Sequence, residues 1–259
     1  VEYLNGGAST PWGARRAERG HREPYGVKYW SLGNEMGFGH MEGPNAPELY
    51  REKALACAEK LLACDGSLKL FSSGPYPSEE WVEKCAVPLG EHAPYLSLHS
   101  YDPFDVVSFM DFTTRRKAAA SYLRIVEAPL RNRDLVRNLR AMLDGCPGGE
   151  KVRISFDEWN VWYAWFRVSG AAEGIYTARM LGMFLREWQR SQMPVCCYFE
   201  PVNEGAMVVN PTGTALTANG QMFAAFSPHA GGREVLCRCQ GLEDLDAFAT
   251  VKEGRGVLT

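Results

Sequence analysis

The chain has 259 residues, of which 46% are hydrophobic and 23% are charged, a composition typical of a folded globular protein. This composition excludes intrinsic disorder and a collagen-like structure. Lys and Arg total 28 against 31 Asp and Glu, for a net charge of −3 with no basic cluster, so nothing favours a nucleic-acid or anionic-membrane partner.

The ends of the chain bear on where the protein acts. The longest apolar runs fall short of the roughly 18 residues that a membrane span needs, and the start VEYLNGGAST lacks the pattern of a signal peptide. We therefore expect a cytoplasmic protein. The chain begins with Val1 rather than Met, so we expect that its N-terminus is missing, and an upstream signal peptide stays open.

The eight cysteines do not form a recognisable metal or disulfide framework. Cys57 and Cys64 are seven residues apart on one predicted helix, and Cys237 and Cys239 lack a second pair or a nearby His to complete a zinc site. We expect reduced, buried, structural thiols rather than disulfides or metal ligands.

Short apolar runs rich in Val, Ile, Tyr and Phe alternate with longer amphipathic stretches along the chain. This alternation predicts βα units and a parallel sheet. The predicted strands are Val27–Leu32, Leu68–Ser72, Tyr95–His99, Val152–Phe156 and Val195–Phe199. The predicted helices are Ala46–Cys64, Ser78–Val87, Arg116–Leu143 with a break near Pro129, Ala171–Ser191 and about Leu216–Phe226.

The pattern changes after His229. Residues 233–259 contain short alternating runs and a turn at Glu253-Gly254, which predicts the first hairpin of a separate β domain. We therefore expect two domains, one over residues 1–230 and the start of another over residues 231–259.

Polar side chains follow four of the five predicted strands. The strands run into Asn34-Glu35, His99 with Tyr101, Asp157-Glu158 and Glu200 with Asn203, and several tryptophans lie beside them. Ligands of parallel α/β folds bind where the carboxyl ends of strands converge. Carboxylates among aromatic rings suit a sugar, whose hydroxyls need acceptors and whose C–H faces need flat apolar surfaces.

Glu35 and Glu158 are candidates for the two carboxylates that glycoside hydrolysis requires. They are far apart in the sequence, so only the tertiary fold could bring them to one strand-end face. The alternative is that both carboxylates cap helices or pair with surface arginines.

Two segments carry a resemblance to a known family. YWSLGNE (Tyr29 to Glu35) and ISFDEWNVWY (Ile154 to Tyr163) resemble the signature segments of glycoside hydrolase family 51, which consists mostly of α-L-arabinofuranosidases. The resemblance continues through Ser97-Leu98-His99-Ser100-Tyr101 and Pro201-Val202-Asn203-Glu204-Gly205, and it covers almost the whole chain in order.

The resemblance implies a (β/α)8 barrel that carries a β-sandwich, and a retaining mechanism through a covalent glycosyl-enzyme. Against that pattern the chain is an incomplete barrel, with strands about 3 to 8 and Val1 near the end of the third strand, followed by the start of the C-terminal sandwich. The resemblance makes Glu35, after the fourth strand, the acid/base, which must keep its proton. It makes Glu158, on the seventh strand, the nucleophile, which must stay ionised.

The resemblance also implies substrate contacts. Asn34 is expected to bind the sugar 2-hydroxyl, with turn formation as its alternative role. His99 and Tyr101 are expected to orient the nucleophile and line the sugar site, although His99 could be a core histidine. The remaining expected contacts are Trp159, which could equally be a packing residue, and Glu200 and Asn203 after the eighth strand.

Three functions stay open at this point. The first is a part of a longer retaining α-L-arabinofuranosidase that acts on arabinose-containing oligo- or polysaccharides, without metal or organic cofactor. A homo-oligomer of the intact enzyme stays open as a partner. The second is a β-glycanase or xylosidase of the same clan. The third is a non-catalytic, truncated remnant.

Overall fold

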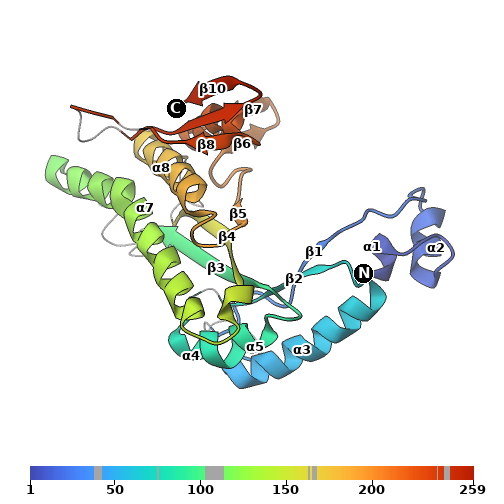
Figure 1. Ribbon diagram of the computed structural model, residues 1–259. Helices are drawn as coiled ribbons and strands as arrows, with labels where there is room; N and C mark the ends of the chain where they lie inside the picture. Colours follow the sequence, from blue (N-terminus) through green and yellow to red (C-terminus); the bar gives the residue numbers. More distant parts are fainter. Residues whose placement is uncertain are drawn as a thin grey trace. The chain divides into compact units, whose positions relative to one another are not determined.

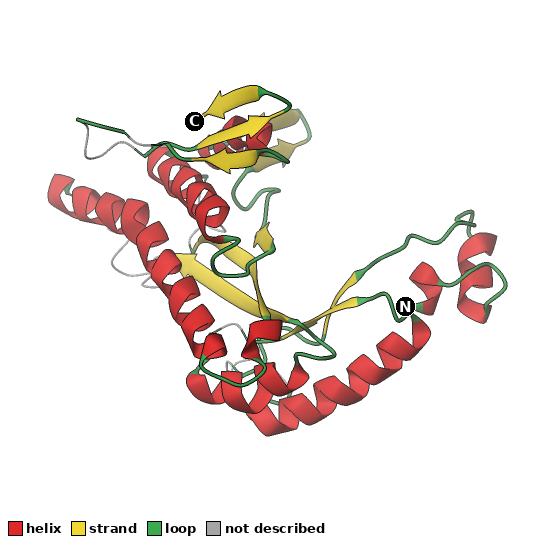
Figure 2. Ribbon diagram, viewed as in Figure 1, coloured by secondary structure: helices red, strands yellow, loops and turns green. Residues whose placement is uncertain are grey.

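The computed structural model describes residues 1–37, 43–74, 76–102, 114–162, 164, 168–237, 239–241 and 246–259 (Figures 1 and 2). Tyr163, at the end of the second signature segment, lies outside these residues. The chain forms two compact units. The first contains residues 1–98 and 139–155, and the second contains residues 99–138 and 156–259.

A five-stranded sheet contains all five strands that the sequence predicts. Its strands are β1 (Tyr29–Ser31), β2 (Lys69–Ser72), β3 (Tyr95–Asp102), β4 (Arg153–Val161) and β5 (Val195–Tyr198), in the order β1-β2-β3-β4-β5. The β1–β2 and β2–β3 pairs are parallel, with Trp30 opposite Leu70 and Phe71 opposite Tyr95. The order follows the chain without a reversal, which is the winding of a (β/α)8 barrel rather than of a doubly wound sheet.

The N-terminal segment of the first unit is helical. It forms α1 (Glu2–Asn5) and α2 (Pro11–Glu18), so the described residues contain no strand at the start of the chain, and the expectation that Val1 lies near the end of a third strand stays a prediction. The Asn5 carboxamide accepts a hydrogen bond from the Val27 amide and donates one to the Val27 carbonyl, each at 2.8 Å. A single side chain thus ties the end of α1 to the residues just before β1.

The other helices of the first unit follow the prediction in outline. They are α3 (Pro47–Cys64), α4 (Glu79–Trp81), the π-helical η1 (Val82–Ala86), α5 (Val87–Leu89) and the 3₁₀ helix η2 (Gly149–Lys151). Helix α3 buries Tyr50, Ala54 and Ala58, four residues apart on one face. Cys57 and Cys64 lie off this face and are exposed, so the expectation of buried thiols is wrong there, although Cys85 of η1 is buried.

Helix α7 (Arg115–Asp144) is continuous through Pro129, so the expected break is wrong. Proline removes one backbone hydrogen bond and crowds the preceding turn. The buried side chains Ile125, Val136 and Leu143 extend on both sides of that position, and their packing outweighs the local preference.

The second unit adds a hairpin that the sequence did not predict. Helix α8 (Ala171–Glu187) leads to β5, and then β6 (Met207–Asn210) pairs with β7 (Gly213–Leu216) before α9 (Ala218–Phe226). The Asn210 carboxamide oxygen accepts from the amides of Thr212 and Gly213 and closes the turn. Thr217 caps α9 by accepting from the Gly220 amide, so the helix begins two residues later than predicted.

The C-terminal segment forms the hairpin that its pattern predicts and one more strand. After η3 (Ser227–His229), strands β8 (Arg233–Val235), β9 (Ala249–Lys252) and β10 (Arg255–Leu258) form an antiparallel sheet in the order β10-β9-β8. Glu253 and Gly254 both have positive φ, 51° and 76°, as a two-residue hairpin turn requires. Among the described helices, none combines the length and the apolar content needed to cross a bilayer.

Candidate active site

The first unit presents Asn34 and Glu35 on a tight turn after β1. Gly33 has a φ of 120° and Glu35 a φ of 51°, so the backbone leaves the extended conformation as soon as the strand ends. A positive φ is uncommon for a non-glycine residue and is found mainly at turns and functional sites. Asn34 is exposed and Glu35 is half-buried at this turn.

Buried side chains from neighbouring elements fix this turn. The Tyr50 hydroxyl of α3 donates to the Leu32 carbonyl at 3.2 Å and accepts from the Ser73 amide at 2.7 Å. The Ser73 hydroxyl in turn accepts from the Met36 amide at 2.9 Å. Burial raises the pKa of Tyr50, which therefore stays a neutral donor. These hydrogen bonds fix the backbone of the turn that carries Glu35.

The second unit holds Glu158 within β4 by contacts to both carboxylate oxygens. The Tyr101 hydroxyl donates a short hydrogen bond to Oε1, and Nδ1 of His99 lies 3.3 Å from Oε2. Both partners come from the carboxyl-terminal half of β3, the neighbouring strand. The Glu158 side chain is 18% exposed, so it is oriented and still accessible.

His99 contacts a second carboxylate, which sequence reasoning did not select. Its Nε2 lies 3.4 Å from Oδ1 of Asp157, and the ring itself is buried. An imidazole donates from both nitrogens only when it is doubly protonated, and in that form it bridges Asp157 and Glu158. Both ring nitrogens face carboxylates, so His99 is arranged to orient these acids. The position of Asp157 directly before Glu158 was the available signal for its role.

Trp159 packs in the core, so the expected sugar contact does not fit its placement. It is 1% exposed, and its ring contacts Tyr176, Phe184, Tyr198 and Phe223. Successive side chains of a strand point to opposite faces, and Trp159 therefore lies on the face opposite Glu158. Trp162, just beyond β4, is the half-buried aromatic residue on the Tyr101 side, with ring centroids 5.7 Å apart.

Glu200 and Asn203 follow β5 and are both exposed. The Asn203 carboxamide oxygen accepts from the Val209 amide at 2.7 Å, and its φ is 62°. Asn203 therefore shapes its own loop. Of the predicted site residues, the second unit brings His99, Tyr101 and Glu158 into contact, whereas Asn34 and Glu35 belong to the first unit.

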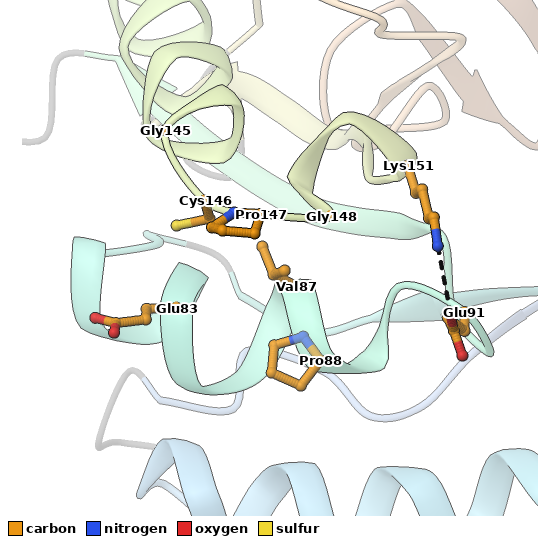
Figure 3. A pocket seen from close by; sticks show the side chains of 9 residues that line it. All are labelled: Glu83, Val87, Pro88, Glu91, Gly145, Cys146, Pro147, Gly148 and Lys151. Atoms are coloured by element: carbon orange, nitrogen blue, oxygen red, sulfur yellow. Dashed lines mark hydrogen bonds and ion pairs between the residues drawn. The ribbon is translucent and has the colours of Figure 1, made fainter.

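The first unit also contains a cavity of about 680 Å³ that is separate from these strand ends (Figure 3). Val87 and Pro88 line one side, Cys146, Pro147 and Gly148 line another, and Glu91 pairs with Lys151 at 3.3 Å. Lys151 lies two residues before β4, so the cavity lies at the amino-terminal end of that strand. Barrel active sites form at the opposite, carboxyl-terminal ends, and this cavity is therefore not the candidate site.

Comparison with known proteins identifies relatives of one kind. A family model described as the α-L-arabinofuranosidase 1 domain matches residues 1–117. Over 233 residues the chain is 31% identical to a probable α-L-arabinofuranosidase C of Aspergillus terreus, covering 83% of this chain and 44% of that protein. It is 29% identical to the intracellular exo-α-(1→5)-L-arabinofuranosidase 1 of Bacillus subtilis, covering 69% of this chain and 35% of that one. The chain thus spans less than half the length of these curated relatives.

Solved structures agree on the fold. A family 51 α-L-arabinofuranosidase from Bifidobacterium longum superposes with a TM-score of 0.80 at 19% identity, over 98% of this chain and 58% of that one. An α-L-arabinofuranosidase from Thermotoga maritima, solved as an arabinose complex, gives a TM-score of 0.74 at 23% identity, over 97% and 54%. The sheet is accordingly part of a (β/α)8 barrel. These findings support an α-L-arabinofuranosidase-like fragment that shares its fold with glycoside hydrolase family 51 enzymes and spans part of their length.

Proposed function

We propose that this chain carries the catalytic carboxylates of a retaining glycoside hydrolase that removes terminal α-L-arabinofuranosyl residues from arabinose-containing oligo- and polysaccharides. The observation that carries the proposal is the bracing of Glu158, with Tyr101 on one oxygen and His99 on the other. A carboxylate oriented in this way at the carboxyl end of a barrel strand is arranged to attack a bound molecule. The similarity to α-L-arabinofuranosidases supports the choice of sugar.

In the first step, Glu158 attacks the anomeric carbon and forms a glycosyl ester. The hydrogen bond from Tyr101 and the charge of a protonated His99 keep Glu158 ionised and aim it. The bond to the leaving oxygen breaks as Glu35 donates its proton to that oxygen. A retaining enzyme needs its two carboxyl groups roughly 5 to 5.5 Å apart.

In the second step, Glu35 acts as the base. It takes a proton from water, the resulting hydroxide attacks the anomeric carbon, and the ester bond to Glu158 breaks. Arabinose then leaves with the configuration that it had in the substrate. The proton that Glu35 took from water restores its acid form for the next cycle.

The neighbouring polar groups complete the proposed sugar site. Asn34, exposed beside Glu35, hydrogen-bonds the sugar 2-hydroxyl, and the edge of Trp162 beside Tyr101 provides an apolar surface. Glu200, exposed after β5, contacts a hydroxyl of the substrate. These groups recognise a sugar without any cofactor.

The proposal extends to domain organisation and location. We assign residues 1–230 to the barrel and residues 231–259, with the sheet β10-β9-β8, to the beginning of a β-sandwich. The name of the intracellular Bacillus relative supports a cytoplasmic enzyme.

The test compares aryl α-L-arabinofuranoside with aryl β-xyloside as substrates of the chain and of its Glu158→Ala and Glu35→Ala variants. The proposal predicts hydrolysis of the arabinofuranoside with retention. Azide should rescue Glu158→Ala and give an arabinosyl azide of inverted configuration, whereas rescue of Glu35→Ala should give the retained configuration. Preference for the xyloside would indicate the xylosidase function. Turnover unaffected by Glu158→Ala, or no turnover of either substrate, would contradict the proposal.

A further inference from the structure

Asn160 is a fully buried polar residue two positions after Glu158 on β4. Its Nδ2 donates to the carbonyls of Phe199 and Glu204, both at 2.8 Å. Its Oδ1 accepts from the Tyr198 hydroxyl at 3.0 Å and from the Val161 amide at 2.7 Å. The carboxamide has two N–H donors and two acceptor positions, and all four are used.

These bonds attach one segment of chain to β4. Phe199 and Glu204 lie near the two ends of residues 199–206, which connect β5 to β6 and include Glu200. The Phe199 amide also donates to the Trp159 carbonyl at 3.2 Å, so both backbone and side chain tie the start of the segment to β4. Near the other end of the segment, Asn160 holds the Glu204 carbonyl.

A second layer of contacts shows that the segment is built around this attachment. The Tyr198 hydroxyl accepts a hydrogen bond from Nδ2 of Asn219 on α9 at 2.8 Å and donates one to Oδ1 of Asn160. A Cβ on Gly205 would lie 1.9 Å from that hydroxyl, so only glycine fits beside it. The Thr217 hydroxyl donates to the carbonyl of Gly205, and it lies 3.1 Å from the Ala206 carbonyl.

We propose that Asn160 is a positioning residue that fixes the segment 199–206, and with it Glu200, beside the strand end that carries Glu158. The inference deepens the proposed function and rests on it for the consequence in catalysis. Burying a carboxamide costs free energy unless every group is paired, and an apolar side chain could fill the same volume. An asparagine at position 160 is explained by its hydrogen bonds to the carbonyls of Phe199 and Glu204, which an apolar side chain could not make.

The first arm of the test measures amide hydrogen exchange. In Asn160→Ala, we expect the amides of Ala206 and Met207, which bond to the Pro201 carbonyl, to exchange at least about tenfold faster. Tyr198→Phe, which removes one of the four bonds, should give a smaller increase in the same amides. Exchange in the β9–β10 hairpin should not change. If the amides of residues 199–207 exchange at the same rate in Asn160→Ala as in the wild type, the inference is overturned.

The matched control is Asn132→Ala. Asn132 is also a buried asparagine of the second unit, but within the described part of the chain its Nδ2 bonds Asp102 and Met180 rather than residues 199–206. We expect this variant to lose folding stability to a similar degree and to leave exchange of 199–207 unchanged. If both variants accelerate exchange there equally, the effect is general loosening and the inference fails.

The second arm measures steady-state kinetics on the aryl arabinofuranoside. We expect Asn160→Ala to raise KM about tenfold with kcat within about threefold, because His99 and Tyr101 still hold Glu158. A variant that merely lost folded protein would lower kcat at unchanged KM, and that result in Asn160→Ala would overturn the inference. Failure of the proposed function can be told apart from failure of this inference. If the proposed function is wrong, the wild type shows no turnover, and hydrogen exchange still decides whether Asn160 fixes residues 199–206.

Discussion

The ends of β1 and β4 present a glutamate in two different ways. Glu35 lies on a turn with a left-handed backbone, and buried hydrogen bonds to that backbone from Tyr50 and Ser73 fix its place. Glu158 lies inside a regular strand, and His99 and Tyr101 hold its carboxylate directly. Buried side chains fix the backbone of the turn that carries Glu35, and two neighbouring side chains hold the carboxylate of Glu158.

This difference suits the two proposed roles. A nucleophile must keep both its charge and its direction of attack, and donors on each oxygen provide both. An acid/base must donate a proton and then accept one from water, so donors that permanently engage its carboxylate would work against it. Glu35 is carried by a turn whose backbone is fixed, which suits a group that must donate and accept a proton in the same place.

The largest effect should come from removing the braced carboxylate. Glu158→Ala is expected to lower kcat/KM on the aryl arabinofuranoside by about a thousandfold or more, which corresponds to roughly 4 kcal/mol of transition-state stabilisation. Asp246→Ala, which removes the exposed ion pair to Arg186, is the control and should leave the rate unchanged. Equal rates in wild type and Glu158→Ala would remove the distinction between the two glutamates.

The brace itself should contribute less than the carboxylate. Tyr101→Phe removes the hydrogen bond to Oε1, and hydrogen bonds to charged groups contribute about 1.5 to 3 kcal/mol, so kcat/KM should fall about tenfold to a hundredfold. Tyr122→Phe alters an exposed tyrosine of α7 and should have no effect. A Tyr101→Phe enzyme with full activity would show that Glu158 does not depend on its side-chain partners.

The turn at the other strand end should respond to a change of backbone. Gly33→Ala forces an alanine into a φ of 120°, and its Cβ would meet Met36 at 3.3 Å, so folding stability should drop by about 1 to 3 kcal/mol. Gly256→Ala, in open space on β10, should change stability by less than about 0.5 kcal/mol. Urea unfolding measures both. Equal stability of the two variants would argue against a backbone-determined position for Glu35.

Asp102 is a buried acid next to Tyr101 on β3, and its ionisation should affect the pH dependence of stability. Its buried carboxylate accepts from Asn132 and Tyr176 and lies 3.5 Å from Arg131. Burial raises the pKa of Asp102, and these partners only partly oppose the shift. A raised pKa in the folded state favours the protonated acid there, so this contribution to stability is full below about pH 4 and is lost as the pH rises through the folded pKa.

The smallest expected effect is therefore a change in how steeply the free energy of unfolding depends on pH. Asp102→Asn replaces the acid by a neutral group of the same shape, and its free energy of unfolding should fall less than that of the wild type as the pH rises from 4. Urea titrations at pH 4, 5, 6 and 7 measure the two slopes. Parallel slopes would show that Asp102 ionises in the folded protein as it does in the unfolded chain.

The sequence predicted the sheet and the candidate site better than the connections between them. All five strands and the polar residues at their ends follow from alternation and from the convergence of parallel strands. Because successive side chains of a strand point to opposite faces, Trp159 lies on the other face of β4 from Glu158, and its core position could have been predicted. The contact between His99 and Asp157 was not, because it depends on side-chain conformations across two strands.

The errors in the helices and loops have physical reasons. Helix α7 continues past Pro129 because packing on both sides outweighs one lost hydrogen bond. The hairpin β6–β7 depends on Asn210 closing a turn, a signal that is short and local. The role of Asn160 requires knowing which carbonyls of a distant segment come to lie beside it, and composition and spacing carry no such information.

The most direct test of the account is covalent trapping of the nucleophile. A 2-fluoro-arabinofuranosyl donor with a good leaving group should form a glycosyl-enzyme that turns over slowly, and peptide mapping by mass spectrometry locates the ester. We predict a single label on the peptide containing Glu158, and none in the Glu158→Ala variant. A label on Glu35 or another residue, or turnover of the arabinofuranoside without any label, would contradict the assignment of the braced carboxylate as the nucleophile.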